Sequence, residues 1–210
     1  MKKILVLTLT ASLFMACSSP SASTVAGEAN EAAAAAESNT EYAVNTAESS
    51  VEWAGTKPTG DVHTGTVAIT EGILATAEGT IAAGNFILDM TQMSVTDEGM
   101  DEETKAKLLG HLTNSDFFEV EKFPTASFSV TGSTTDSLSG NLTIKDITKS
   151  ITVPYTMTTE GNNITASASF SIDRTLWGVK FNSGNFFENL GEYLIDDAVQ
   201  FDINLVANTK

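Results

Sequence analysis

The sequence predicts an all-β protein that forms a closed antiparallel barrel or sandwich of about eight strands. Apolar and polar residues alternate with a period of two in several segments, which is the repeat of a strand with one buried and one wet face. In the last such segment, Val199, Phe201, Ile203 and Leu205 share one face. Gly, Asn and Asp separate these segments at short intervals. Turns at that spacing are typical of an antiparallel meander.

About ten segments carry this alternation or the β-branched composition of strands. We expect some of them to merge or to be short. In chain order they are 42–45, 50–57, 62–70, 73–78, 80–90, 125–132, 138–144, 150–158, 163–172 and 198–207.

One segment, 101–112, has a helical pattern instead. Its leucines recur at helical spacing, and acidic residues fill its first turn, where they interact favourably with the helix dipole. Asp97 or Asp101 can cap its N-terminus. Because the segment lies between strands, we expect the helix to cross one end of the barrel like a lid.

The first residues have the composition of an export signal. Two lysines precede an apolar run, 4–15, that is too short to span a membrane as a mature helix. The run leads into Ala16-Cys17, which resembles a bacterial lipobox. Residues 1–16 are therefore predicted to be a lipoprotein signal peptide, with Cys17 lipidated. The alternative is an ordinary secretory signal in which this cysteine is incidental.

Acyl chains on Cys17 would anchor the protein stably, because two or more chains exceed the marginal membrane binding of one. The predicted location is the bacterial cell envelope, at the periplasmic face or the outer membrane. Residues 17–40 are rich in Ala, Ser and Glu, with no large apolar residue beyond Val25, so we expect a flexible lipid-anchored tether. Residues 41–210 then form a single β-barrel domain.

Composition argues against several partners and sites. The net charge of -16 becomes -16 - 2 = -18 once a signal peptide with two lysines is removed. Such an excess argues against binding to nucleic acid and against electrostatic docking on anionic lipid. Cys17 is the only cysteine, so an intramolecular disulfide or a thiolate metal cage is excluded. No protein partner is indicated.

The two histidines, His63 and His111, are the candidates for catalysis or metal binding. Zinc or a hydrolytic triad needs three convergent groups, and the sequence has no HExxH or GxSxG motif and no closely spaced histidine pair. We therefore expect no metal and no catalytic residue. For His111, a structural hydrogen-bonding role is the stronger expectation.

Arg174 is the only arginine, and aromatic residues follow it closely. Its guanidinium could pair with an interior carboxylate or a phosphate, or stack on Trp177. The alternative is a surface turn in which Asp173 and Arg174 pair and contribute almost nothing to stability.

The stretch 107–128 places His111, the pair Phe117-Phe118 and Phe123 close together in the sequence. So much aromatic surface must be buried, either around a pocket or as a plug in the core. The interior of a barrel of about eight strands is either filled by side chains or holds one small ligand. Composition leaves both interpretations open.

Several motifs resemble those of the YceI-like family of polyisoprenoid-binding periplasmic proteins, over about 42–207. Most specific is the stretch 107–128, with Lys-Leu-Leu-Gly-His-Leu followed by Asp-Phe-Phe and Phe-Pro-Thr-Ala-Ser-Phe. Asp146 stands where the family pattern has glycine. The other matching segments are 53–57 (Trp-Ala-Gly-Thr-Lys), 63–65 (His-Thr-Gly), 140–149 and 172–178.

The resemblance implies an extended lipocalin-like antiparallel barrel with one short helix near its mouth and an apolar tunnel for a long isoprenoid chain. Each buried CH2 group contributes about 0.8 kcal/mol, so a tunnel gains affinity from ligand length. The implied ligand is a polyisoprenoid or a similar amphiphilic or quinone-like lipid, without any further cofactor. The expected tunnel residues are Trp53, Phe86, Phe128, Phe170 and Phe201; those expected at the mouth or polar head group are His63, His111, Phe117, Phe118, Arg174 and Trp177.

The resulting hypothesis is a non-catalytic protein that binds, carries or sequesters such a lipid at the cell envelope. Two alternatives remain. One is an enzyme acting on a prenyl or quinone-like substrate, with His63 or His111 as the base. The other is a structural, stress-related lipoprotein whose barrel is filled by side chains.

Overall fold

The computed structural model describes residues 24–210. The predicted signal peptide and the predicted lipidation site, Cys17, lie outside these residues. None of the helices within 24–210 is long and apolar enough to cross a membrane.

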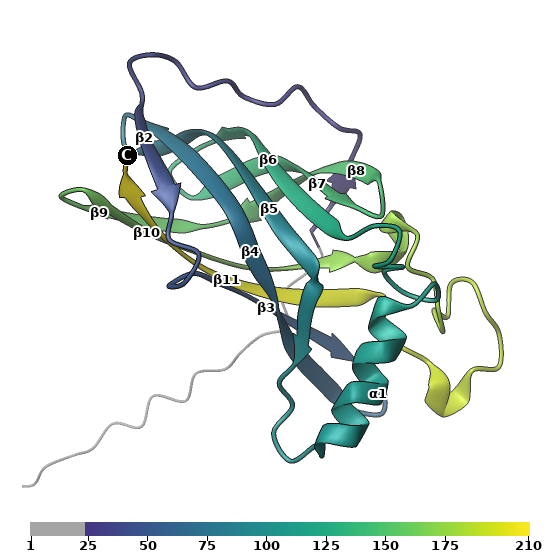
Figure 1. The fold of residues 1–210 in the computed structure, drawn as a ribbon. Helices are drawn as coiled ribbons and strands as arrows, with labels where there is room; N and C mark the ends of the chain where they lie inside the picture. The colour runs from purple at the N-terminus through teal and green to yellow at the C-terminus, as the bar shows by residue number, and fades with distance from the viewer. Residues whose placement is uncertain (1–23) are drawn as a thin grey trace, which may run out of the picture.

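The described chain forms a closed antiparallel barrel with one α-helix, α1 (Glu102–Thr113), at one end (Figure 1). The strand order is β8-β7-β6-β5-β4-β2-β11-β10-β9, with β3 also pairing with β4 and β11. The predicted all-β barrel with a single short helix is confirmed. The strands are β1 (Ala26–Gly27), β2 (Thr40–Val44), β3 (Ser50–Thr56), β4 (Val62–Ala77), β5 (Thr80–Val95), β6 (Thr125–Ser133), β7 (Ser137–Ile144), β8 (Ile147–Pro154), β9 (Thr156–Glu160), β10 (Asn163–Asp173) and β11 (Ala198–Thr209).

Two pairs of short strands reduce the ring to the expected eight positions. Strands β2 and β3 both lie between β4 and β11, so they share one position. Only Tyr155 separates β8 from β9; β8 pairs with β7, and β9 pairs with β10. Strands β8 and β9 therefore act as one bent strand that closes the barrel between β7 and β10.

The segments 62–70 and 73–78 are not two strands but one, β4. Glu71 and Gly72 were expected to form a turn, yet the chain passes through them with a register shift against β5 between Ile69 and Glu71. A Cβ on Gly72 would lie 2.4 Å from Val44 Cγ2. Gly72 therefore allows close packing at an irregularity of the β4–β5 pairing. Glycine is common both at such irregularities and in turns, so residue type alone does not distinguish them.

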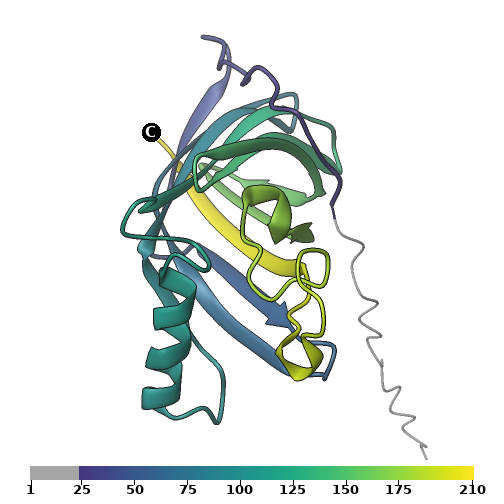
Figure 2. The same ribbon diagram turned by 90° about the vertical axis from the view of Figure 1, so that its right-hand side faces the viewer.

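The helix α1 begins as predicted. Asp101 is its N-cap and accepts a hydrogen bond from the Thr104 amide at 2.9 Å, while Asp97 has another partner, described below. Leu112 is buried and joins the apolar cluster that includes Trp53 and Met90. Figure 2 shows α1 and the yellow-green loop after β10 on opposite sides of the same end of the barrel.

A second apolar cluster lies toward the opposite end of the barrel. Leu74, Val130 and Ile164 are fully buried there, together with Tyr42. Tyr155 belongs to the same cluster, and its hydroxyl donates to the Thr134 carbonyl at 3.0 Å.

Residues 24–40 do not form the free tether that their composition predicts. Ala26 pairs with Ile151 of β8, and the Thr24 amide donates to the Ser171 carbonyl of β10 at 2.6 Å. The segment thus lies between β8 and β10, past the part of β10 that pairs with β9. It then runs back over the barrel to β2 (Figure 1). Backbone hydrogen bonds to the edges of β8 and β10 hold it in place. The prediction of a tether considered only how much apolar surface the segment can bury and did not include these bonds.

Two asparagines hold the next part of this segment. The Asn30 amide donates to Asn141 Oδ1 at 2.9 Å, and Asn141 Nδ2 donates to the Asn30 carbonyl at 2.6 Å.

We predict that Asn141→Ala will speed hydrogen exchange of the Asn30 amide about 5- to 10-fold, because each net hydrogen bond contributes about 1 kcal/mol. Hydrogen exchange measured by mass spectrometry checks this.

The matched control is Asn204→Ala, since Asn204 is exposed on β11 and should leave exchange in 24–33 unchanged. Full exchange of these amides in the wild-type protein at unprotected rates would instead restore the tether interpretation.

Candidate functional site

An internal cavity of about 250 Å³ runs along the barrel and is lined by residues of both apolar clusters. The five predicted tunnel residues, Trp53, Phe86, Phe128, Phe170 and Phe201, all line it. Phe86 lies opposite Phe128, with ring centroids 6.5 Å apart, and Phe170 lies opposite Phe201, at 5.8 Å. The side chains therefore leave room in the interior, which does not fit a completely filled barrel.

The polar lining residues gather mainly at one end of the cavity, which we call the mouth. Thr56, Lys57, His63, Arg174 and Asp196 are found there. The mouth is framed by the β3–β4 hairpin, by α1 and by the loop after β10 (Figure 2). Elsewhere the lining is apolar apart from Tyr155 and Ser167. The surface exposed to the cavity is nonetheless apolar throughout, which suits an apolar chain, and most of the polar side chains lie beside the mouth.

The register of β3 and β4 explains the two short motifs near the mouth. Trp53 lies directly across from Gly65, and His63 lies across from Gly55. Trp53 lines the cavity, and its ring lies against Gly65 on the neighbouring strand, whereas no atom lies within 4 Å of a Cβ built on Gly55. A Cβ on Gly65 would lie 2.3 Å from Trp53 Cζ2 and 1.9 Å from the Ser94 carbonyl oxygen. Gly65 therefore lets the indole lie flat against the barrel wall.

His63 forms a charge-assisted pair with Asp97. Its Nδ1 lies 2.7 Å from Asp97 Oδ2, and the carboxylate also accepts from the Thr64 amide at 2.5 Å. Burial raises the pKa of Asp97, but the hydrogen bonds from Thr64 and His63 outweigh it and hold the pKa below the ordinary value of 3.8. Asp97 is therefore ionised at neutral pH, so it fixes the orientation of the His63 ring.

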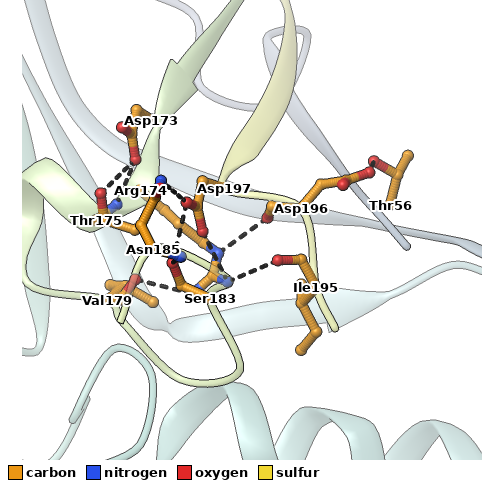
Figure 3. Close-up of polar contacts among 10 residues, drawn as sticks. All are labelled: Thr56, Asp173, Arg174, Thr175, Val179, Ser183, Asn185, Ile195, Asp196 and Asp197. Atoms are coloured by element: carbon orange, nitrogen blue, oxygen red, sulfur yellow. Dashed lines mark hydrogen bonds and ion pairs between the residues drawn. The ribbon is translucent and has the colours of Figure 1, made fainter. Parts of the chain in front are cut away.

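Arg174 organises the loop side of the mouth (Figure 3). Its guanidinium is buried and donates to the carbonyls of Val179, Ile195 and Asp196 at 2.8, 3.2 and 3.1 Å. Asp197 Oδ1 lies 3.4 Å from Arg174 Nη2. Burial lowers the pKa of Arg174, and the carboxylates of Asp197 and its neighbours oppose that shift. Of the alternatives raised by the sequence, pairing with an interior carboxylate is the one observed.

The two aspartates beside Arg174 extend this network. Asp197 Oδ2 accepts from Ser183 Oγ at 2.9 Å and from Asn185 Nδ2 at 2.7 Å. Asp196 Oδ2 accepts from Thr56 Oγ1 at 2.7 Å, which joins the loop to the end of β3. The loop is therefore held to the barrel by polar bonds at the mouth (Figure 3).

The structure does not bring all the predicted mouth residues together. Phe117 and Phe118 line the cavity, and the Phe117 ring lies 5.4 Å from that of Phe181. His111, in contrast, is exposed on α1 and does not line the cavity. Trp177 is fully buried, and its Nε1 donates to the Leu142 carbonyl at 3.0 Å.

These two residues were therefore misplaced by the sequence prediction. The exposed face of α1 carries His111, and Trp177 belongs to the apolar cluster that includes Trp53 and Met90. Arg174 lies over the Phe117 ring instead, at 5.9 Å.

Two important partners were missed, Asp97 and Asp197. Both are distant in sequence from the side chains they hold, so spacing carries no signal for them. Within residues 24–210, no group of three His, Cys, Asp or Glu side chains is arranged to hold a metal ion.

We predict that Gly65→Ala will lower the free energy of unfolding by about 1–3 kcal/mol, because the new methyl group overpacks against Trp53 and the Ser94 backbone. Gly55→Ala on β3 is the matched control, since nothing lies within 4 Å of its added Cβ. It should change stability by less than about 0.5 kcal/mol. Chemical denaturation of both variants checks this, and equal losses would contradict the packing role.

We predict that the Asp97 carboxylate stabilises the fold in a pH-dependent way. A pKa held below 3.8 in the folded state contributes stability that is complete above this value and is lost as the pH falls through the folded pKa. The stability difference between the wild type and Asp97→Asn should therefore shrink below about pH 4.

Urea denaturation between about pH 3 and 7 measures this difference across the range of the shift. The control is Asp202→Asn on β11, since Asp202 is exposed. A gap between Asp97→Asn and the wild type that stays constant over this range would disprove the effect.

Comparison with known proteins agrees with this fold. The YceI-like domain family matches residues 42–207, whereas no curated protein matches the chain significantly. BcnA of Burkholderia cenocepacia is 20% identical, with a TM-score of 0.57 over 78% of this chain and 98% of that chain. A polyisoprenoid-binding domain from Saccharophagus degradans is 11% identical, with a TM-score of 0.58 over 80% and 98%. At these identities the structural likeness shows the fold alone, but the match over 42–207 is decisive, and the chain belongs to the YceI-like family.

Proposed function

We propose that the protein binds an elongated amphiphilic lipid in the barrel cavity and carries or sequesters it without chemical turnover. The observation behind this proposal is the cavity itself, whose exposed surface is apolar throughout and which has polar and charged residues beside its mouth. A polyisoprenoid is the proposed ligand class. The structural similarity to a domain described as polyisoprenoid-binding supports it, as does membership of the YceI-like family.

The energetics of such binding are favourable. Burial of about ten CH2 groups at about 0.8 kcal/mol each contributes about 8 kcal/mol, which corresponds to a dissociation constant on the order of 1 µM before the costs of association. A chain that fills the cavity therefore needs few polar contacts. The polar mouth would then choose among head groups instead of supplying most of the affinity.

Lipidation of Cys17 and a place in the bacterial cell envelope are part of this proposal. Since the chain is held to the barrel from Thr24 onward, the residues between Cys17 and Thr24 reach at most about 25 Å even when fully extended. An acyl anchor at Cys17 would hold the β8–β10 side of the barrel close to the membrane surface. Lipid could then be exchanged over a short distance.

An enzyme acting on a prenyl or quinone-like substrate is the second candidate, and the His63–Asp97 pair favours it. A histidine oriented by a carboxylate is an arrangement that general bases use. Replacing His63 by Gln separates the two functions. Under the binding proposal, lipid stays bound and no product forms with either the wild type or the variant.

We predict that Ala168→Trp will abolish ligand binding, because Ala168 lines the cavity and the larger ring would fill it. Thr165→Trp is the control, since Thr165 is exposed on the same strand. Native mass spectrometry and organic extraction of residues 24–210 measure the lipid that the protein retains. Titration with a fluorescent prenyl probe measures the binding of added lipid.

The wild type and the Thr165 variant should retain lipid and bind the probe. A circular dichroism melt shows whether each variant folds, and Ala166→Phe provides a milder block of the same cavity. A folded wild type that neither retains lipid nor binds the probe would refute the proposed function.

A further inference from the structure

The loop after β10 presents large aromatic side chains to water. Phe186 is 48% exposed, Phe187 50% and Tyr193 66%. The same loop also carries Phe181, which packs against Phe117. Exposed apolar side chains that gather in one place mark a contact site for a membrane or for another protein, whereas single ones carry no such meaning. The three exposed rings therefore indicate a contact with something outside residues 24–210.

The backbone beneath two of these rings is held by a buried residue. Ser183 is fully buried, and its carbonyl accepts from the amides of Phe186 and Phe187 at 3.1 and 3.0 Å. The Ser183 hydroxyl donates to Asp197, which lies beside Arg174. The turn thus fixes the two phenylalanines at the surface, so binding through them requires little reordering of the chain.

Other exposed apolar side chains lie beside this loop. Val62 pairs with Thr56 across β3 and β4, and Thr56 bonds to Asp196 of the loop. A Cβ on Gly178, near the start of the loop, would lie 3.4 Å from Ile147 Cδ1. The exposed large apolar residues in or beside the loop are thus Val62, Ile147, Leu176, Phe186, Phe187 and Tyr193, while Ile73 lies apart, next to Leu74 of the second apolar cluster.

The described chain also begins beside this loop. The Thr24 amide donates to the Ser171 carbonyl, and Ser171 lies three residues before Arg174, where the loop starts. Figure 2 shows the purple N-terminal segment and the yellow-green loop on the same side of the barrel, opposite α1. Because Cys17 lies at most about 25 Å from Thr24, an acyl anchor there would keep the loop close to a bilayer.

We propose that the loop after β10 docks the mouth of the barrel on the surface of a zwitterionic bilayer, with Phe186, Phe187 and Tyr193 inserted among the lipids. The inference rests on the proposed function, since it takes the acyl anchor at Cys17 from it. Because the loop frames the mouth, docking brings the entrance of the cavity to the bilayer. A lipid then passes between membrane and cavity without a long path through water.

Charge favours a zwitterionic surface over an anionic one. The loop carries one lysine, Lys180, and two glutamates, Glu188 and Glu192, so it has no basic cluster of the kind that binds anionic lipid. Lys180 Nζ lies 4.4 Å from the centroid of the Phe186 ring. Tyrosine is enriched at membrane–water interfaces, where its hydroxyl stays hydrated. The acidic charge of the whole chain also opposes pairing of two copies through this loop.

Tryptophan reporters test the docking. Phe187→Trp places an indole on the loop, and Ile73→Trp is the matched control, since Ile73 is 45% exposed at the other end of the barrel. Residues 17–210 are coupled through Cys17, the only cysteine, to a maleimide phospholipid in phosphatidylcholine vesicles. Brominated acyl chains should quench the Phe187→Trp emission beyond that of the wild type, whose two tryptophans are buried. The Ile73→Trp emission should stay at the wild-type level.

Removal of the rings tests the consequence for lipid transfer. Replacing Phe186 and Phe187 together by Ser should slow transfer of a fluorescent prenyl probe from vesicles into the cavity about 10-fold or more, because the apolar contact with the bilayer is lost. The same variant should bind the probe in vesicle-free solution as tightly as the wild type. Ile73→Ser should match the wild type in both assays, and a circular dichroism melt checks that each variant folds.

The outcomes separate this inference from the proposed function. Absence of extra quenching in Phe187→Trp would overturn the docking, while probe binding in solution would still support the proposed function. A wild type that shows the docking but binds no probe would refute the proposed function alone. Stronger quenching with phosphatidylglycerol vesicles would overturn the preference for a zwitterionic surface. Dimers in solution that Phe187→Ser dissociates would assign the loop to a second copy of the chain and overturn the docking.

Discussion

Closure of the barrel is the constraint on which the other features of this protein depend. Every strand edge must find a backbone partner, and β9 pairs with β10 over only part of its length. The remaining seam between β8 and β10 is occupied by the N-terminal segment, through Thr24 and Ala26. The strands and the N-terminal segment therefore together form the wall around the apolar interior.

The mouth is held by polar bonds together with apolar packing. Trp177 and Val179 of the loop after β10 are buried in the apolar cluster that includes Trp53. Arg174 adds hydrogen bonds to three loop carbonyls. Asp197 keeps its charge balanced at 3.4 Å. The cost of burying this arginine is offset by three carbonyl acceptors and the Asp197 carboxylate, and the entrance keeps its shape.

The glycine that faces Trp53 connects the fold to the proposed ligand. Gly65 allows the Trp53 ring to lie against the wall, so the indole occupies the lining without closing the tube. Asp97 fixes the ring of His63 beside it. The same strand pair thus contributes apolar surface to the cavity and a His63–Asp97 pair beside its mouth. Neither feature requires a cofactor or a moving part.

Alternation of apolar and polar residues was sufficient to predict the barrel strands, because period two is a local property of each segment. The family resemblance, not the alternation, implied the five aromatic tunnel residues that line the cavity. Capping preference limited the helix start to Asp97 or Asp101, and the structure shows Asp101. Lys145 and Asp146 in the β7–β8 turn both adopt positive φ, at 51° and 58°, a conformation that favours glycine. Asp is among the other residues that accept this conformation, so Asp146 can replace the glycine of the family pattern.

Contacts between distant segments could be decided only by the tertiary structure. His63 with Asp97, Arg174 with Asp197, and Thr24 with Ser171 join residues whose spacing has no periodic signature. The exposure of His111 and the burial of Trp177 depend on how α1 and the loop after β10 dock. The sequence by itself determined the strands, the helix and the apolar interior, since these follow from local pattern. Only the folded barrel decided which polar groups meet at the mouth, because their positions depend on strand register and closure.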